Sequence, residues 1–261
     1  MSKYSLKMHK TSCHDKIVEP DQGLQLINGP VLFKHPFTCT ISGSSKCGKT
    51  AFLLKMLQSD TIQPQADRIV ILYKRWQPLY DNFKSFLPKA EFYKGIPRNL
   101  DDDKFFDVRK RNLIVLDDLM SDTSKDNCVS ELFTEGSHHR NLSVVNLTQN
   151  LFPPGKQSTT QRRNTQYLVL FKSPMGQDQI QTMGKFMFPG RVKSFMKIYE
   201  NATRKPYGHL VIDTNESYGN RLKTDVFNEL PKDPPIEYPM SLQEKERTPI
   251  KKRLHCRKQL S

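Results

Sequence analysis

The residues best suited to chemistry lie in one short segment, residues 43–50, which has the complete G-x-x-x-x-G-K-[ST] pattern of a phosphate-binding loop. Its two glycines allow the backbone to turn N–H groups toward phosphate oxygens. Lys49 would reach the β- and γ-phosphates of ATP, and the Thr50 hydroxyl would ligate Mg²⁺. The residues expected to surround the phosphates are Gly43, Ser44, Ser45, Lys46, Cys47, Gly48, Lys49 and Thr50.

The sequence on either side of this segment supplies the elements that the motif needs. Residues 37–42 alternate β-branched and apolar side chains and predict a strand, whereas residues 51–57 have the composition and period of a helix. A strand, a glycine-containing loop and a helix in this order place the positive end of the helix dipole at the phosphates. A chance Gly-Lys turn would not require that order, so a nucleotide site is favoured.

Two adjacent acids follow a second predicted strand. Residues 113–116 are all apolar, and Asp117 and Asp118 come directly after them. In open α/β sheets ligands bind at the carboxyl ends of the strands, which is where these acids would lie. We expect Asp117 to hold Mg²⁺, largely through water, and Asp118 to orient or deprotonate the attacking water. An Asp-rich turn without chemistry is the alternative, and the phosphate-binding loop upstream favours the functional interpretation.

A third buried strand, predicted at residues 142–147, is followed by Thr148, Gln149 and Asn150. Gln149 could contact the γ-phosphate or its water as a sensor, or belong to a polar turn. Further strands are predicted at 67–73, 167–171 and 208–213, and helices at 76–86, 129–133, 176–188 and 192–200. This order predicts an α/β fold with an open, mostly parallel sheet flanked by helices.

The chain divides into three parts by composition. Residues 1–22 are polar and predict a flexible N-terminal arm, residues 23–213 carry the nucleotide-binding domain, and residues 214–261 form a proline-containing basic tail. Residues 241–261 hold seven Lys/Arg against two Glu, a net charge of +5. Such a tail suits DNA, an acidic protein partner or, around residues 251–253, nuclear import.

Composition limits the classes of function. A net charge of +14 favours a polyanion partner, most simply nucleic acid, over a generally basic surface. No stretch approaches the roughly 20 apolar residues of a membrane span, and the first ten residues lack the apolar core of a secretory signal. Five cysteines without a C-x-x-C pair indicate reduced thiols in the cytosol or nucleus and argue against a zinc site.

The wording and order of these motifs resemble a known family. TISGSSKCGKT, ILYKRWQPLYD, LIVLDDLM, LFTEGSHHRNLSVVNLTQN and QYLVLFKSP, all within residues 30–213, are similar to the DNA-packaging ATPases of the FtsK–HerA superfamily. The likeness is to the poxvirus-type branch found in adintoviruses and Maverick/Polinton elements. SHHRNLSVVNLTQN is the more discriminating stretch. The resemblance implies a P-loop NTPase, an ATP-driven motor that moves viral double-stranded DNA into a preformed capsid.

The resemblance also assigns roles to single residues. Lys49 and Thr50 match the Walker A pair, Asp117 and Asp118 the Walker B acids, and Gln149 the sensor. This chain has Asp118 where many members have glutamate. The family's trans-acting arginine would lie near the face between subunits; the candidates are Arg163, which we place first, Arg140 and Arg162.

The same resemblance implies partners and a place of action. The partners are double-stranded DNA without sequence preference, further copies of the chain in a ring, and a viral capsid or portal vertex. The place is the host nucleus or cytoplasm where virus particles assemble; neither a membrane nor secretion is expected. Three alternatives remain: a P-loop nucleotide kinase, a DNA helicase and a nucleotide-gated, non-catalytic assembly protein. The intact set of Walker residues argues against the last.

Overall fold

The computed structural model of the chain describes residues 24–100, 102, 104–119, 129, 131–136, 140–152 and 163–227. The expected N-terminal arm (1–22), the basic segment 241–261 and Arg162 lie outside the described residues. None of the helices within these ranges is long and apolar enough to cross a membrane.

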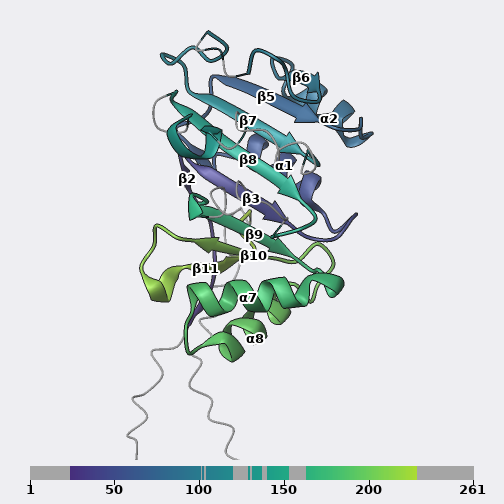
Figure 1. The fold of residues 1–261 in the computed structure, drawn as a ribbon. Helices are drawn as coiled ribbons and strands as arrows, with labels where there is room; N and C mark the ends of the chain where they lie inside the picture. The colour runs from purple at the N-terminus through teal and green to yellow at the C-terminus, as the bar shows by residue number, and fades with distance from the viewer. Residues whose placement is uncertain are drawn as a thin grey trace, which may run out of the picture.

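The main sheet has nine strands in the order β1-β11-β10-β9-β3-β8-β7-β5-β6 (Figure 1). Six neighbouring strands run parallel. These six are β9 (Tyr167–Phe171), β3 (Thr38–Ser42), β8 (Leu142–Thr148), β7 (Asn112–Asp117), β5 (Arg68–Tyr73) and β6 (Glu91–Lys94). The open, mostly parallel α/β sheet expected from the sequence is therefore confirmed.

The remaining strands extend the sheet beyond β9. β10 (His209–Asp213) is antiparallel to β9, β11 (Leu222–Thr224) is antiparallel to β10, and β1 (Leu26–Asn28) is parallel to β11. Because β11 belongs to the sheet, the folded unit continues past residue 213, where the sequence suggested a boundary. A separate two-stranded sheet pairs β2 (Phe33–Lys34) with β4 (Ile62–Gln63).

Helices cover both faces of the sheet. Val115 of β7 belongs to the apolar cluster under α1 (Lys49–Gln58) and α2 (Leu79–Phe86), whereas its neighbour Leu116 belongs to a cluster on the opposite face. That opposite face also carries α7 (Gln177–Met187) and α8 (Val192–Ala202), which pack against β9 and β10, and the short π-helix η1 (Leu132–Gly136) (Figure 1). Burial on both faces explains why the central strands are apolar at consecutive positions.

The segment between β5 and α2 differs from the expectation. The sequence predicts a helix from residue 76, but α2 begins only at Leu79, after Pro78 at its N-cap. A proline lacks the N–H that a helix interior needs, so it suits the start of the helix. Residues 74–78 therefore form a loop at the carboxyl end of β5 and lie beside the ends of β7 and β3.

Candidate active site

The loop that joins β3 to α1 has the backbone of a tight phosphate-binding turn. Lys46 has a φ of 61° and Gly48 a φ of 111°, and the latter value strains any residue with a side chain. Gly43 is constrained by space instead. A Cβ at that position would lie 2.6 Å from Phe171 Cβ and 2.7 Å from Cys47 Sγ, closer than real Cβ atoms come. Both glycines of the motif are thus required by the local geometry.

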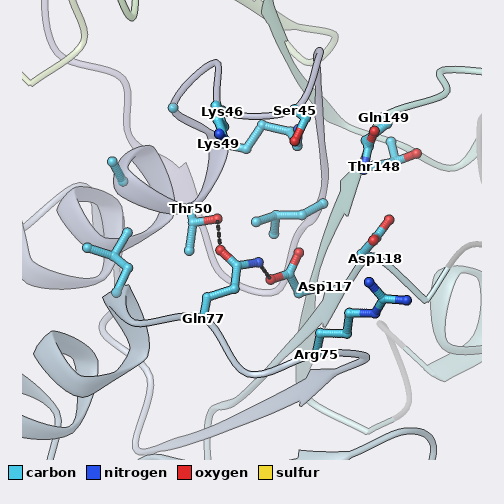
Figure 2. A pocket seen from close by; sticks show the side chains of 14 residues that line it. Ser45, Lys46, Lys49, Thr50, Arg75, Gln77, Asp117, Asp118, Thr148 and Gln149 are labelled. Atoms are coloured by element: carbon cyan, nitrogen blue, oxygen red, sulfur yellow. Dashed lines mark hydrogen bonds between the residues drawn. The ribbon is translucent and has the colours of Figure 1, made fainter.

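A cavity of about 410 Å³ opens above this loop at the carboxyl ends of the parallel strands (Figure 2). The residues that line it are Ser45, Lys46, Gly48, Lys49, Thr50, Ala51, Arg75, Gln77, Leu79, Asp117, Asp118, Leu147, Thr148 and Gln149. Lys49 and Thr50, the two acids and Gln149 therefore come together from β3–α1, β7 and β8, as the sequence predicts. Gly43, Ser44 and Cys47 do not line this cavity; burial raises the pKa of the Cys47 thiol.

The Lys49 ammonium is held over the loop by the chain's own carbonyl groups. Its Nζ donates hydrogen bonds of 2.8 Å to the carbonyl oxygens of Gly43 and Ser44. The Ser44 hydroxyl in turn donates to the Lys172 carbonyl at 3.1 Å, which ties the loop to the end of β9. Lys49 Nζ also lies 4.0 Å from Cys47 Sγ. A partly buried cation whose contacts within the described residues are neutral carbonyl groups and a thiol is suited to an anionic ligand.

Asp117 is buried at the end of β7, with 5% of its surface exposed, and accepts two hydrogen bonds. The Gln77 Nε2 amide donates to Asp117 Oδ2 at 2.8 Å, and the Tyr80 hydroxyl donates to the same oxygen. Burial raises the pKa of Asp117 and is the largest influence on it, while the Tyr80 hydrogen bond acts in the opposite direction. The same amide reaches Thr50, whose hydroxyl donates to Gln77 Oε1 at 3.2 Å (Figure 2).

These contacts decide whether Mg²⁺ fits. Within the described ranges no group of three or more His, Cys, Asp or Glu side chains could hold a metal ion by itself. Thr50 and Asp117 nevertheless face each other across the width of one amide group, as their shared partner Gln77 shows. A hydroxyl, a carboxylate, water and substrate phosphates form the oxygen set that Mg²⁺ prefers. The residues therefore fit the ion.

Asp118 lies in different surroundings from its neighbour. Its side chain is exposed and its backbone is left-handed, with a φ of 54°. Its N–H donates to the Leu147 carbonyl at 3.3 Å, which fixes the turn after β7. Gln149 is also exposed, in a turn where the Thr148 hydroxyl donates to the Asn150 carbonyl at 2.9 Å and accepts from the Asn150 N–H at 3.0 Å. Both side chains are therefore presented to the cavity by fixed turns.

Two polar residues of the cavity, Arg75 and Gln77, were not expected from the sequence. Figure 2 shows the Arg75 guanidinium extending toward Asp118. The sequence predicts a helix from residue 76, and this helix would include Gln77 and begin directly after Arg75, so neither residue was expected in a loop. The rule that ligands bind at the carboxyl ends of parallel strands would have identified them, because they follow the end of β5.

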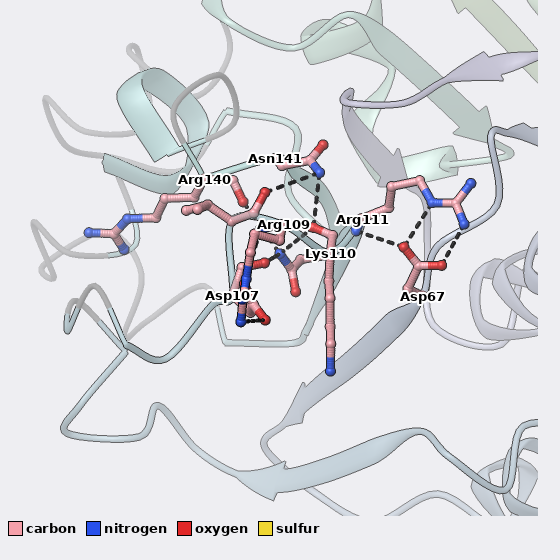
Figure 3. A network of polar contacts seen from close by, with 9 residues as sticks. Asp67, Asp107, Arg109, Lys110, Arg111, Arg140 and Asn141 are labelled. Carbon is pink, nitrogen blue, oxygen red and sulfur yellow. Dashed lines mark hydrogen bonds and ion pairs between the residues drawn. The ribbon is translucent and has the colours of Figure 1, made fainter.

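The two described arginine candidates lie at the other end of the sheet. Arg163 precedes β9 and is exposed, and Arg140 precedes β8, so both lie at the amino ends of strands that run parallel to β3. Arg140 Nη1 donates to the Leu100 carbonyl at 3.4 Å, and the neighbouring Asn141 side chain donates to the Lys110 carbonyl at 3.0 Å (Figure 3). Neither arginine lines the cavity of its own subunit.

A second, apolar hollow of about 170 Å³ adjoins the cavity and shares Gly48 and Ala51 with it. Its other lining residues are Phe52, Lys55, Phe171, Tyr207, His209 and Phe227. His209 Nδ1 lies 3.2 Å from the Tyr207 carbonyl oxygen, which can only accept, so Nδ1 carries the proton. Burial lowers the pKa of His209, and its Nε2 is a buried acceptor without a hydrogen-bond partner among the described residues.

Comparison with known proteins gives only distant similarity. No protein-family model matches the chain, and no curated protein sequence does. Among solved structures, the genome packaging NTPase B204 from Sulfolobus turreted icosahedral virus 2 in complex with sulfate is 12% identical, with a TM-score of 0.46, over 69% of this chain and 92% of that chain. The same NTPase in complex with ATP-gammaS is 14% identical, with a TM-score of 0.43, over 69% and 93%.

A third structure is more distant still. EccC from Thermomonospora curvata (ATPases 2 and 3, in complex with a signal sequence peptide) is 12% identical, with a TM-score of 0.37, over 59% of this chain and 35% of that chain. Because these TM-scores all lie below 0.5, the fold assignment rests on the strand order and the site on its own geometry.

Proposed function

We propose that this chain is an ATPase that couples ATP hydrolysis to the movement of double-stranded DNA into a viral capsid. The observation that carries the hydrolytic part is the single cavity in which Lys49 and Thr50 of the phosphate-binding loop meet Asp117, Asp118 and Gln149 from two neighbouring strands. These residues supply a cation for phosphate, oxygen ligands for a metal ion and polar groups for a water molecule.

In this proposal, the N–H groups of residues 43–50 hold the phosphates, and the Lys49 ammonium exchanges its carbonyl partners for the β- and γ-phosphate oxygens. Mg²⁺, held by Thr50 and through water by Asp117, would neutralise charge on these oxygens when bound. Gln149 orients the attacking water. The oxygen of the water bonds to the γ-phosphorus while a proton of the water passes to Asp118. The bond from the γ-phosphorus to the bridging oxygen breaks, which releases ADP and phosphate.

The apolar hollow is a suitable place for the base of the nucleotide. It begins at Gly48 and Ala51, where the phosphate cavity ends, so a nucleoside can extend from one space into the other. Tyr207, which is 70% exposed, offers an aromatic surface for stacking.

The proposed DNA partner rests on charge and on the sequence resemblance to packaging ATPases. A chain with a net charge of +14 can grip the phosphate backbone, and a motor that passes over any sequence can hold only that backbone. We propose a homo-oligomeric ring that docks on a capsid or portal vertex, in the nucleus or cytoplasm of a host cell where particles assemble. Residues 1–22 and the basic segment 241–261 would serve as arms outside the ATPase domain.

The test is phosphate release by the full-length protein with and without double-stranded DNA of several unrelated sequences. We expect DNA to stimulate hydrolysis to the same extent whatever its sequence, and we expect this stimulation to decrease as the salt concentration rises.

Lys49→Ala should reduce the rate of hydrolysis by at least about 100-fold, because the variant loses the positive charge that stabilises the negative charge developing on the phosphate oxygens. Asp118→Asn should bind ATP but hydrolyse it slowly, because an amide cannot accept the proton of water.

Other outcomes would identify the alternatives. A Lys49→Ala protein with the wild-type rate would show that the cavity is not the site of hydrolysis. Phosphoryl transfer to an added nucleoside monophosphate would identify a nucleotide kinase, and separation of the DNA strands would identify a helicase. Nucleotide binding without turnover, with or without DNA, would indicate a non-catalytic assembly protein.

A further inference from the structure

Gln77 occupies the space between the two residues that fit a metal ion. Its Oε1 accepts the Thr50 hydroxyl proton at 3.2 Å, and its Nε2 donates to Asp117 Oδ2 at 2.8 Å (Figure 2). The amide is oriented to complement both partners, since its carbonyl end meets a donor and its amino end meets a carboxylate. We refer to this three-residue contact as the Gln77 bridge.

The Gln77 bridge and a bound metal ion exclude each other. In the bridge the Thr50 hydroxyl points its proton at the amide, and one Asp117 oxygen is taken by the amino group. In the proposed site Mg²⁺ would be held directly by Thr50 and through a water molecule by Asp117, and the ion with that water would need the space that the amide occupies between these two groups. Gln77 must therefore leave before Thr50 and Asp117 can serve the ion.

We propose that Gln77 is an internal competitor for the metal ion, which keeps the metal site closed in the nucleotide-free protein and is displaced when Mg²⁺ and the triphosphate bind. This inference rests on the proposed nucleotide site. When only a fraction of the protein molecules is in the form that can bind a ligand, the observed affinity for that ligand is reduced by the same fraction. The bridge therefore lowers the affinity for Mg·ATP without touching the phosphates.

The displacement has a visible consequence, because Gln77 lies in the short loop 74–78 with Arg75 and Trp76. Arg75 lines the same cavity, so release of Gln77 changes how the guanidinium is presented to Asp118 and the γ-phosphate. Trp76, the single tryptophan of the chain, packs on Tyr80 with ring centroids 5.3 Å apart. Tyr80 also donates to Asp117, so the indole is connected to the proposed metal site through Tyr80.

The surroundings of Trp76 make it a natural reporter. Its ring lies 5.3 Å from that of Tyr73 and 5.5 Å from that of Phe92, and Lys84 Nζ lies 4.5 Å from its centroid. The side chain is also 40% exposed, so a shift of the loop changes both its solvation and its charged neighbour. We expect its emission to change when Mg²⁺ and ATPγS are added together, and much less when ATPγS is added with EDTA.

The decisive measurement is the affinity of the full-length protein for ATPγS with saturating Mg²⁺ and with EDTA. The ratio of the two affinities reports the coupling between nucleotide and metal. In Gln77→Ala we expect this ratio to rise about tenfold, because hydrogen bonds that compete with the ion are lost, while the affinity in EDTA stays the same. Gln77→Asn keeps the amide but is too short to span both partners, and it should change the ratio in the same direction.

Gln65→Ala is the matched control. Gln65 Nε2 donates to Asp60 Oδ1 at 2.8 Å, the same type of contact at the same distance, but outside the cavity. In Gln65→Ala, the ratio of the affinities for ATPγS with Mg²⁺ and with EDTA should equal that of the wild type. If Gln77→Ala does not fold, Gln77→Asn and the emission of the wild-type protein still decide the question.

The possible failures are distinguishable. A wild-type protein that does not bind ATPγS under either condition would overturn the nucleotide site, and the Gln77 bridge with it. A wild type that binds more tightly with Mg²⁺, beside Gln77 variants whose ratio is unchanged or lower, would overturn only the competition. Emission from Trp76 that is the same with Mg·ATPγS and with ATPγS in EDTA would also overturn it.

Discussion

Asp117 and Asp118 are neighbours in sequence but differ in burial and in backbone conformation. The first is buried and hydrogen-bonded by Tyr80 and Gln77, whereas the second is exposed on a left-handed residue. Pairs of acids in unlike environments commonly take unlike roles. The turn after β7, rather than the identity of the residues, therefore separates a buried carboxylate, which we propose holds the metal ion, from an exposed one that can meet water.

The burial of Asp117 predicts an effect on stability that is independent of catalysis. Its pKa is raised in the folded protein, so the folded state holds the proton more tightly than the unfolded chain. The free energy of unfolding then falls as the pH rises from the unfolded pKa, about 3.9, through the folded pKa. We expect Asp117→Asn to raise the Tm of the nucleotide-free protein at pH 7 by about 2–4 °C, the shift that ~1 kcal/mol gives in a chain of this size.

Thermal unfolding between pH 4 and 8 checks this expectation. The difference in Tm between Asp117→Asn and wild type should shrink as the pH falls toward 4, because the wild-type carboxyl then becomes neutral too. Asp118→Asn is the control, since Asp118 is exposed and asparagine tolerates a left-handed backbone. A lower Tm for Asp117→Asn at pH 7 would mean that the hydrogen bonds of Tyr80 and Gln77 outweigh the cost of burial.

At the scale of elements, the sequence predicts best what the sheet buries on both faces. β3, β7, β8 and β9 were placed within about two residues, because a strand covered on both faces must be apolar throughout. β6 was missed because Glu91–Lys94 lies at the sheet edge, half-buried at most, and has no apolar run. The loop 74–78 was missed because the aromatic residues from Trp76 onward have the spacing of a helix, although the helix itself begins only after Pro78.

The apolar hollow could not be predicted, because its walls come from four separate parts of the chain. Residue pairing between β9 and β10 sets Phe171 opposite His209, and the segment before β10 carries Tyr207 in a left-handed conformation with a φ of 60°. This conformation places the Tyr207 ring against Gly48, where a Cβ on the glycine would come within 2.9 Å of Tyr207 Cδ1. No pattern in the sequence predicts this contact between Tyr207 and Gly48.

If this hollow binds the base of the nucleotide, its aromatic wall should contribute to the affinity for ligands that contain a nucleoside, and not to the affinity for phosphates alone. We expect Tyr207→Ala to weaken ATP binding about tenfold, since stacking on an aromatic side chain contributes about 1–3 kcal/mol per base. Inorganic tripolyphosphate, which lacks a base, should compete equally well in variant and wild type. Phe86→Ala, another exposed aromatic residue but one that lines neither space, is the control. An equal loss for ATP and tripolyphosphate would instead indicate a damaged phosphate-binding loop.

At the scale of the whole molecule, the parallel sheet separates two sets of charged residues. The cavity lies at the carboxyl ends of the strands, and Arg140 and Arg163 lie at the amino ends. An arginine at the far end of its own sheet is remote from its own phosphate-binding loop, whereas in the proposed ring it would be available to a neighbouring subunit. This placement is compatible with the proposed ring, although Arg75 offers a third arginine that is already in the cavity.

The ring therefore makes a prediction about mixtures of subunits. An arginine supplied in trans is typically worth about 10³–10⁵ in rate. We expect Arg163→Ala to bind ATP normally, to hydrolyse it poorly, and to suppress wild-type subunits more than in proportion when the two are mixed. Arg163 is the better first choice because its side chain is exposed, whereas Arg140 also donates to the Leu100 carbonyl.

Activity that falls only in proportion to the mutant fraction would show that the subunits act independently. A silent Arg163→Ala beside an inactive Arg140→Ala would transfer the role to Arg140, and loss only in Arg75→Ala would place the arginine in cis.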